Sequence, residues 1–247
     1  MTPALLAALF LPLFPLSIVL NVALTRLRAP AARAALLLVW PQFGAALLAA
    51  QPAVPDMFAV WALLSAAFYA LRLLTVRDLG MWAGFGACSG LALTWQLAAV
   101  GAGAAELHLF VFWFSLPAAL LALLAGPIAR RLGAAYAGLH GGVAGQLPRL
   151  SGLLAVLLLA AIATPPFPGF FALLDLLTRL GAPAALGVLA VWLFWGWAAT
   201  RLLQGFVAGS GARTFACADL ARSGALAYAA ALGAFAVAGF YLTGGGL

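Results

Sequence analysis

Few side chains in this sequence can carry charge or take part in a reaction, and their types limit the chemistry available. Five acids and two histidines occur in 247 residues, and all twelve basic residues are arginine. A lysine nucleophile, Schiff base or proton carrier is therefore excluded. The two cysteines, Cys88 and Cys217, fit no zinc, iron–sulfur or haem spacing. The sequence implies no cofactor and no metal, and it offers no catalytic site of its own.

The first candidates for a proton or ion path are Glu106 and His108. They are two residues apart, so on a helix they would point about 200° away from one another. At a membrane boundary they would be either solvated interface residues or an access point for protons, since histidine changes charge near neutral pH.

Two further acids lie next to arginines. Asp175 precedes Arg179 by four residues, which is the spacing of a helix-face ion pair. Asp78 directly follows Arg77, and we expect these two to pair at a membrane boundary.

The composition places all of these residues in a membrane protein. Apolar residues make up 67% of the chain and charged residues 7%, whereas a soluble domain carries about 25% charged residues. The net charge of +7 would suggest a nucleic-acid partner in a soluble protein. Here the arginines lie in short gaps between apolar runs, where positive charge fixes membrane orientation. We therefore expect contact with lipid and none with nucleic acid.

The apolar runs are long enough for about eight transmembrane helices. A bilayer core about 30 Å thick needs about 20 residues of helix. We expect an all-α fold, a single polytopic membrane domain over residues 1–247, with one or two helices broken by proline. The first run lacks the basic start of a signal peptide and should remain a helix. The predicted spans are 3–25, 31–50, 57–75, 79–101, 107–129, 150–178, 183–206 and 221–243.

The arginines alternate between the loops that join these spans. Eleven of the twelve fall in loops on one side, and only Arg179 falls on the other. By the positive-inside rule the arginine-rich side is cytoplasmic. This predicts a multi-pass protein of the bacterial inner membrane with both termini in the periplasm.

One span contains a specific proline pattern. Residues 147–171 read LPRLSGLLAVLLLAAIATPPFPGFF. This segment resembles the antiporter-like membrane subunits of respiratory complex I, Mrp-type cation antiporters and membrane-bound hydrogenases. The resemblance rests on the order and spacing of Leu147, Pro148, Pro165, Pro166, Gly169 and Phe170.

The prolines of this segment also predict a break in the helix. Proline lacks the amide donor and clashes with the preceding turn, so the helix should open near residues 161–165, with freed carbonyls satisfied by a neighbouring helix or water.

Two other segments are similar to the same family, in the same order. Residues 61–100 resemble its paired helices, whose short polar link ends in Asp-Leu, here Asp78 and Leu79. Residues 188–209 resemble a helix that ends in a basic, aromatic and glycine motif. The family-like core thus covers about 57–209, and a chain of eight spans would be a shortened version of the family.

The resemblance also implies a proton path that this chain lacks. Family members are thought to move protons through a glutamate in one helix and a lysine in a broken helix. Alignment on Asp78 puts Ala87 at the glutamate position. Residues 108–126 take the place of the lysine-bearing broken helix without a lysine, and Leu173 stands where another lysine often follows.

We therefore expect a non-catalytic membrane subunit of a multi-subunit energy-coupling complex. It would be a scaffold or a degenerate proton-channel module, and its partners would be other membrane subunits. Two alternatives stay open: a membrane partner in an inorganic-carbon or cation uptake complex, and a stand-alone secondary transporter. The sequence does not decide whether the parent complex is an oxidoreductase. The candidates for any surviving path are Asp78, Glu106, His108 and Asp175.

Overall fold

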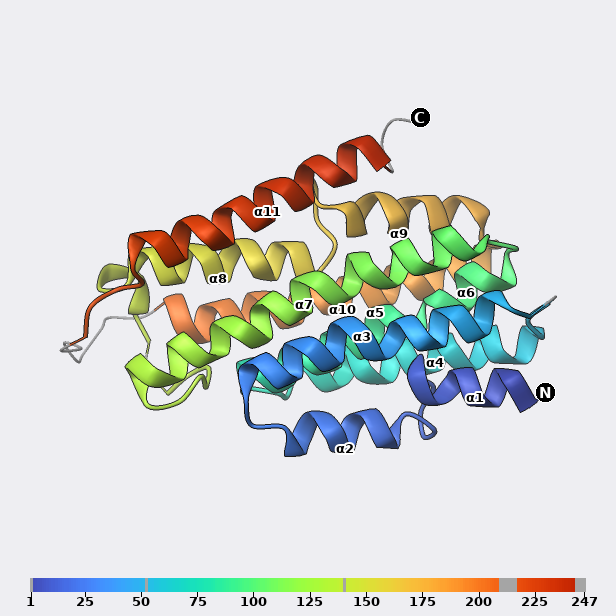
Figure 1. Cartoon of the computed structure of the whole chain (residues 1–247), viewed down its shortest axis with the longest axis horizontal. Coiled ribbons are helices and arrows are strands. Elements are labelled where there is room, and N and C mark those ends of the chain that lie inside the picture. Colours follow the sequence, from blue (N-terminus) through green and yellow to red (C-terminus); the bar gives the residue numbers. More distant parts are fainter. Residues whose placement is uncertain (1, 52, 140, 209–216, 243–247) are drawn as a thin grey trace.

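The computed structural model describes residues 2–51, 53–139, 141–208 and 217–242, and most of them are helical. The helices lie along the long axis of the molecule, and the direction of the chain alternates from one predicted span to the next (Figure 1). In chain order they are α1 Thr2–Phe10, α2 Ile18–Arg26, α3 Pro30–Ala49, α4 Asp56–Leu73, α5 Leu79–Ala92, α6 Thr94–Ala99, α7 Ala104–Leu132, the 3₁₀ turn η1 Val143–Gly145, α8 Pro148–Ala161, α9 Pro168–Arg179, α10 Ala182–Val207 and α11 Arg222–Leu242.

Within the described residues, five helices are individually long and apolar enough to cross a membrane, namely α3, α4, α7, α10 and α11. Each of the other three predicted spans consists of two short helices in tandem: α1 with α2, α5 with α6, and α8 with α9. Helices α5 and α6 are joined by the single residue Leu93, whose backbone stays helical, so only the other two pairs enclose a break. Counted in this way, the helices match the eight predicted spans. The chain is a multi-pass, all-α membrane protein, as expected.

Helix α7 forms the centre of the bundle. In its most apolar stretch 72% of the residues are buried, compared with 17% in α11. Helices α3, α5 and α8 all pack against it. Pro117 and Pro127 lie inside α7, which continues unbroken to Leu132.

Residues 108–126, which take the place of the family's broken helix, are therefore continuous helix in this chain. Proline removes one helical hydrogen bond, but packing on several sides keeps the turn around Pro117 helical. Helix α7 ends instead at Gly133, whose φ of +83° suits glycine at a helix carboxyl end.

The first predicted span is broken, which the sequence analysis did not foresee. Helix α1 ends at Phe10 and α2 begins at Ile18, and residues 11–17 form turns. Pro12 and Pro15 lie in this segment and cannot donate backbone hydrogen bonds.

Neighbouring helices supply hydrogen bonds to the backbone of this first break. The indole Nε1 of Trp61 in α4 donates to the Phe14 carbonyl over 2.5 Å, and the Phe14 amide donates to Ser65 Oγ over 3.0 Å. Trp40 Nε1 in α3 donates to the Leu9 carbonyl over 3.2 Å. Unpaired backbone groups are costly in lipid, so these side chains allow the break to persist.

The second break was predicted correctly. Helix α8 ends at Ala161 and α9 begins at Pro168, with Pro165 and Pro166 between them. Ala163 has a φ of +54°, a left-handed conformation in which the helical ladder stops.

A neighbouring helix satisfies a carbonyl at this break, also as predicted. Trp192 Nε1 in α10 donates to the Ile162 carbonyl over 2.8 Å. Gly169, in the first turn of α9, packs over Ala163, because a Cβ there would lie 3.4 Å from the Ala163 Cβ. The proline pattern thus marks an interruption between α8 and α9, after which Gly169 packs closely against Ala163.

Candidate functional site

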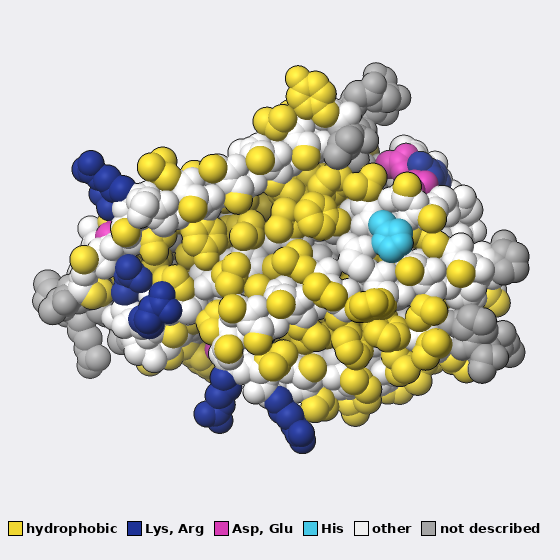
Figure 2. Space-filling view, in the orientation of Figure 1, with side chains coloured by type: hydrophobic (Ala, Val, Ile, Leu, Met, Phe, Trp, Pro, Cys, Tyr) yellow, Lys and Arg dark blue, Asp and Glu magenta, His cyan; other side chains and the backbone are white. Residues whose placement is uncertain are grey.

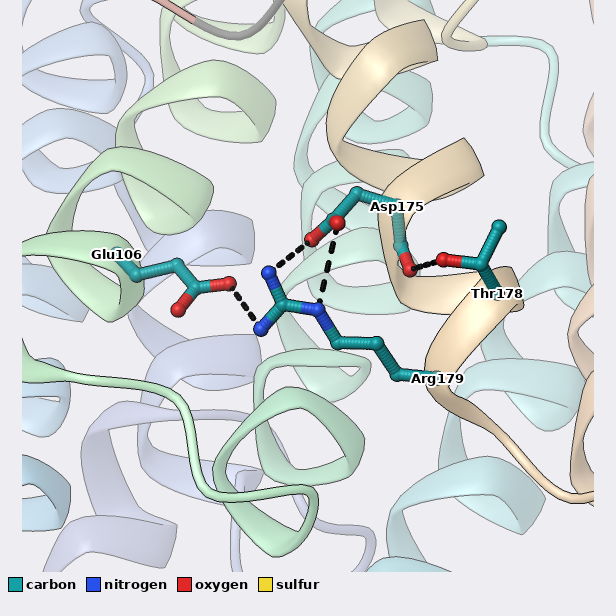
Figure 3. Close-up of polar contacts among 4 residues, drawn as sticks. All are labelled: Glu106, Asp175, Thr178 and Arg179. Carbon is teal, nitrogen blue, oxygen red and sulfur yellow. Dashed lines mark hydrogen bonds and ion pairs between the residues drawn. The ribbon is translucent and has the colours of Figure 1, made fainter. Parts of the chain in front are cut away.

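Three charged residues meet where α7 begins and α9 ends (Figure 3). Arg179 Nη1 lies 2.7 Å from Glu106 Oε1, and Arg179 Nη2 lies 2.8 Å from Asp175 Oδ2. The predicted pair between Asp175 and Arg179 is therefore present, and Glu106 joins it from another span. All three side chains are more than a third exposed, so solvent screens the pairs and each is worth at most about 1 kcal/mol.

His108 takes no part in this cluster. Its Nδ1 lies 2.7 Å from Gln42 Oε1 in α3, and Gln42 Nε2 donates to the His108 carbonyl over 3.4 Å. Glu106 contacts α9 whereas His108 contacts α3, so the two point to different neighbours, as their spacing predicted. The structure does not join them into one relay.

Asp78 lies at the opposite end of the bundle, where α4 ends and α5 begins (Figure 1). Its Oδ1 caps α5 by accepting from the Met81 amide over 2.7 Å, and it lies 3.6 Å from Arg33 Nη1. The expected pair with Arg77 is wrong, because the backbone at Asp78 is extended and adjacent side chains then point to opposite sides. Gly80 makes room for the Arg33 guanidinium, which a Cβ would meet.

The four predicted path residues thus fall into two groups at opposite ends. Glu106, His108 and Asp175 are at one end, and Asp78 is at the other. The described part of the chain includes all five acids of the sequence, and each lies near a helix end or in a connection. Figure 2 shows that most of the visible arginine side chains project from one half of this face, whereas a histidine lies on the other half.

The interior contains a polar cluster that the sequence analysis missed. Tyr69 in α4 is fully buried, and its hydroxyl lies 2.6 Å from Ser17 Oγ in the first break. Asn21 Nδ2 in α2 donates to the same hydroxyl over 2.7 Å. Cys88 Sγ lies 4.0 Å from Asn21 Oδ1. Tyr69 thereby ties the first span to α4 and α5.

A second polar contact lies on the next residue of α5. Ser89 Oγ donates to the Ala66 carbonyl over 2.7 Å and accepts from Trp195 Nε1 over 2.8 Å. Together the side chains of Ser17, Asn21, Tyr69, Cys88, Ser89 and Trp195 form what we term the neutral polar network. None of these side-chain types is ordinarily charged at neutral pH.

This arrangement supports structural hydrogen bonding in the interior and ion pairing at the two ends. Ala87, at the position expected for the family glutamate, is buried beside Cys88 and Ser89. Among the described residues, no group of three histidine, cysteine, aspartate or glutamate side chains could hold a metal ion. The signal for the network was available in the sequence as polar residues inside apolar runs, Asn21 above all.

Solved structures of known complexes contain chains with this architecture. One chain of respiratory complex I from Thermus thermophilus superposes with a TM-score of 0.83 and 23% identity, over 97% of this chain and 54% of that one. A chain of the Mrp complex from Dietzia sp. DQ12-45-1b superposes with a TM-score of 0.74 and 17% identity, over 85% of this chain and 42% of that one. A chain of the archaeal membrane-bound sulfane sulfur reductase, a respiratory membrane complex, superposes with a TM-score of 0.76 and 16% identity. The match covers 96% of this chain and 51% of that one.

The chain has the fold of the antiporter-like membrane subunits. The fold implied by the sequence resemblance is therefore confirmed. No protein-family profile matches the chain, and no curated protein matches it. The chain spans about half the length of the chains that share its fold.

Proposed function

We propose that this chain is a non-catalytic membrane subunit of a multi-subunit energy-coupling complex of the antiporter-like type. It would act there as a scaffold, in a bacterial inner membrane with its arginine-bearing end in the cytoplasm and both termini in the periplasm. The observation that carries the proposal is a contrast between fold and chemistry. The backbone shares the fold of chains from an Mrp complex and two respiratory complexes, whereas its interior polar side chains are neutral.

Proton transfer through a bilayer depends on titratable groups placed within hydrogen-bond reach or joined by water. Here the carboxylates lie at the two ends, and the interior between them is filled by apolar side chains and by neutral polar ones, which include the neutral polar network. Ser17, Asn21 and Ser89 already donate to or accept from fixed partners. These contacts support a packing role for the interior.

A stand-alone secondary transporter is the second candidate, and one observation favours it. Such transporters place broken helices around a midplane site, and this chain has breaks in both its first and sixth spans. Against it, backbone groups at both breaks are already bonded to side chains of neighbouring helices, through Trp61 and Ser65 at one and Trp192 at the other. Backbone groups that already form hydrogen bonds with neighbouring side chains are not free to bind a substrate.

Reconstitution separates the two candidates. The full chain in liposomes should show no proton or cation flux above empty vesicles, and the protein solubilised from its native membrane should co-purify with other membrane subunits. Tyr69→Phe interrupts the neutral polar network, and Tyr136→Phe alters a tyrosine that is 44% exposed.

A saturable flux by the isolated chain would contradict the scaffold role. If Tyr69→Phe abolished that flux and Tyr136→Phe did not, the network itself would be the path. The stand-alone transporter would then replace the scaffold as the proposed function.

A further inference from the structure

A pocket opens at the arginine-bearing end of the molecule, beside the end of α4 and the last turns of α10. Its volume is about 230 Å³, and its wall includes Leu74, Arg77, Gly138, Arg201 and Leu202. The wall therefore combines two cationic side chains with apolar surface.

Backbone hydrogen bonds hold the segments that carry these arginines. The Ala137 amide donates to the Arg77 carbonyl over 2.8 Å, and the Gly138 amide donates to the Gly205 carbonyl over 2.8 Å. A Cβ at Gly205 would lie 2.9 Å from the Ala137 Cβ, so the loop lies directly against α10. The pocket is thus a fixed junction of three segments.

Neither arginine of the pocket is paired with an acid. Within the described ranges, the ion pairs between arginine and carboxylate involve Arg33 and Arg179. Arg77 and Arg201 are both exposed, and two like charges that face one pocket repel each other. An anion between them would remove this repulsion.

The outer surface of α10 leads to the pocket. Exposed apolar residues recur every three or four positions along it, and the stripe ends at Arg201 one turn after Trp197. Tryptophan is enriched at the level of lipid headgroups. The residues of this stripe are Leu186, Leu189, Leu193 and Trp197, with exposures of 67%, 44%, 72% and 54%.

We infer that this pocket binds the phosphate of an anionic phospholipid between Arg77 and Arg201, with the acyl chains along the exposed stripe of α10. Guanidinium groups bind phosphate oxygens with two parallel hydrogen bonds. Basic pockets between transmembrane helices bind acidic lipid headgroups. The adjoining apolar stripe favours a lipid over free phosphate. This inference does not depend on whether the chain scaffolds a complex or transports ions.

Native mass spectrometry of the detergent-purified full chain tests the inference, with dioleoylphosphatidylglycerol and dioleoylphosphatidylcholine as probes. The wild-type chain should retain phosphatidylglycerol in preference to phosphatidylcholine. The double variant Arg77→Gln/Arg201→Gln should bind phosphatidylglycerol about tenfold more weakly or worse, whereas Arg77→Lys/Arg201→Lys, which keeps the charge but not the paired hydrogen bonds, should bind with an affinity between those of this variant and wild type. The matched control is Arg26→Gln/Arg28→Gln, which removes two exposed arginines elsewhere in the chain and should bind like wild type.

Two outcomes would overturn the inference. One is equal loss of phosphatidylglycerol in the pocket variant and the control variant, because binding would then reflect net charge alone. The other is stabilisation by inorganic phosphate that depends on Arg77 and Arg201 without any retained lipid, which would make the pocket a site for free anions. Both arginines are exposed, so their substitution leaves the core unchanged, and circular dichroism of each variant verifies that it is folded.

Discussion

The two broken spans differ in what replaces the missing helical hydrogen bonds. The first break, residues 11–17, lies beside serine, asparagine, tyrosine and tryptophan side chains from α2, α3 and α4. At the second, residues 162–167, the side-chain hydrogen bond that the described part of another helix supplies is that of the Trp192 indole, and Phe167 stacks on Phe235 of α11. The first break is therefore held by several side-chain hydrogen bonds, whereas the second combines one such bond with an aromatic contact.

This difference shows that a helix break in a membrane protein depends on its neighbours as much as on its prolines. Pro41, Pro117 and Pro127 all lie inside continuous helices. Pro12 and Pro15 lie in a break, and the adjacent helix α4 presents Trp61 and Ser65 to the freed backbone. Donors and acceptors across the interface lower the cost of an open turn.

The largest expected effect on stability is at Tyr69, whose hydroxyl contacts Ser17 in the first break and Asn21 in α2. Tyr69→Phe removes the hydroxyl that pairs with Ser17 and Asn21, and it leaves polar groups unpaired in a buried place. We expect the free energy of unfolding to fall by about 1–3 kcal/mol, measured by denaturant titration in detergent micelles.

Tyr136→Phe is the matched control, because Tyr136 is 44% exposed. It should change the free energy of unfolding by less than about 0.5 kcal/mol. Equal losses in the two variants would show that the Tyr69 hydroxyl does not stabilise the first break.

An intermediate effect is expected at the second break. Trp192→Phe removes the donor to the Ile162 carbonyl and should lower the free energy of unfolding by about 1 kcal/mol. Hydrogen exchange should also rise in residues 163–167. Trp61→Phe should cost less, because Phe14 is 44% exposed and its amide keeps Ser65 as an acceptor.

Trp197→Phe serves as control for the second break, since Trp197 is 54% exposed. If Trp61→Phe lowered the free energy of unfolding more than Trp192→Phe did, the comparison between the two breaks would be reversed. The second break would then be the one with redundant support.

The smallest effect is expected at the far end of α9, the second half of the broken span. Arg179→Gln removes both ion pairs of the charged cluster and leaves Glu106 and Asp175 without their shared cation. The loss should stay below about 1 kcal/mol and should shrink as salt is added.

Thermal unfolding at low and high salt measures this effect, with Arg28→Gln as the control. A loss of the same size at both salt concentrations would mean that Arg179 stabilises α9 through packing instead of charge.

The sequence predicted the spans and the second break because both depend on local properties. Apolar length sets the number of spans, and the adjacent Pro165 and Pro166 remove two backbone donors in succession, which favours a break at that point. The pairing of Asp175 with Arg179 is also local, since both lie on one helix four residues apart.

What the sequence did not predict depends on contacts between distant segments. Glu106 reaches Arg179 from another span, and Arg33 replaces Arg77 as the partner of Asp78 because of backbone direction. The contact between Ser17 and Tyr69 joins residues 52 positions apart. No periodicity within a single helix encodes such a meeting.

The tryptophans at the two breaks give each of them its own spectroscopic signal. Trp61 at the first break and Trp192 at the second each donate an indole hydrogen to a backbone carbonyl. Fluorine-labelled tryptophan would therefore yield resonances that respond to opening of one break and not the other. The motions of the two interruptions could then be followed separately in the same intact molecule.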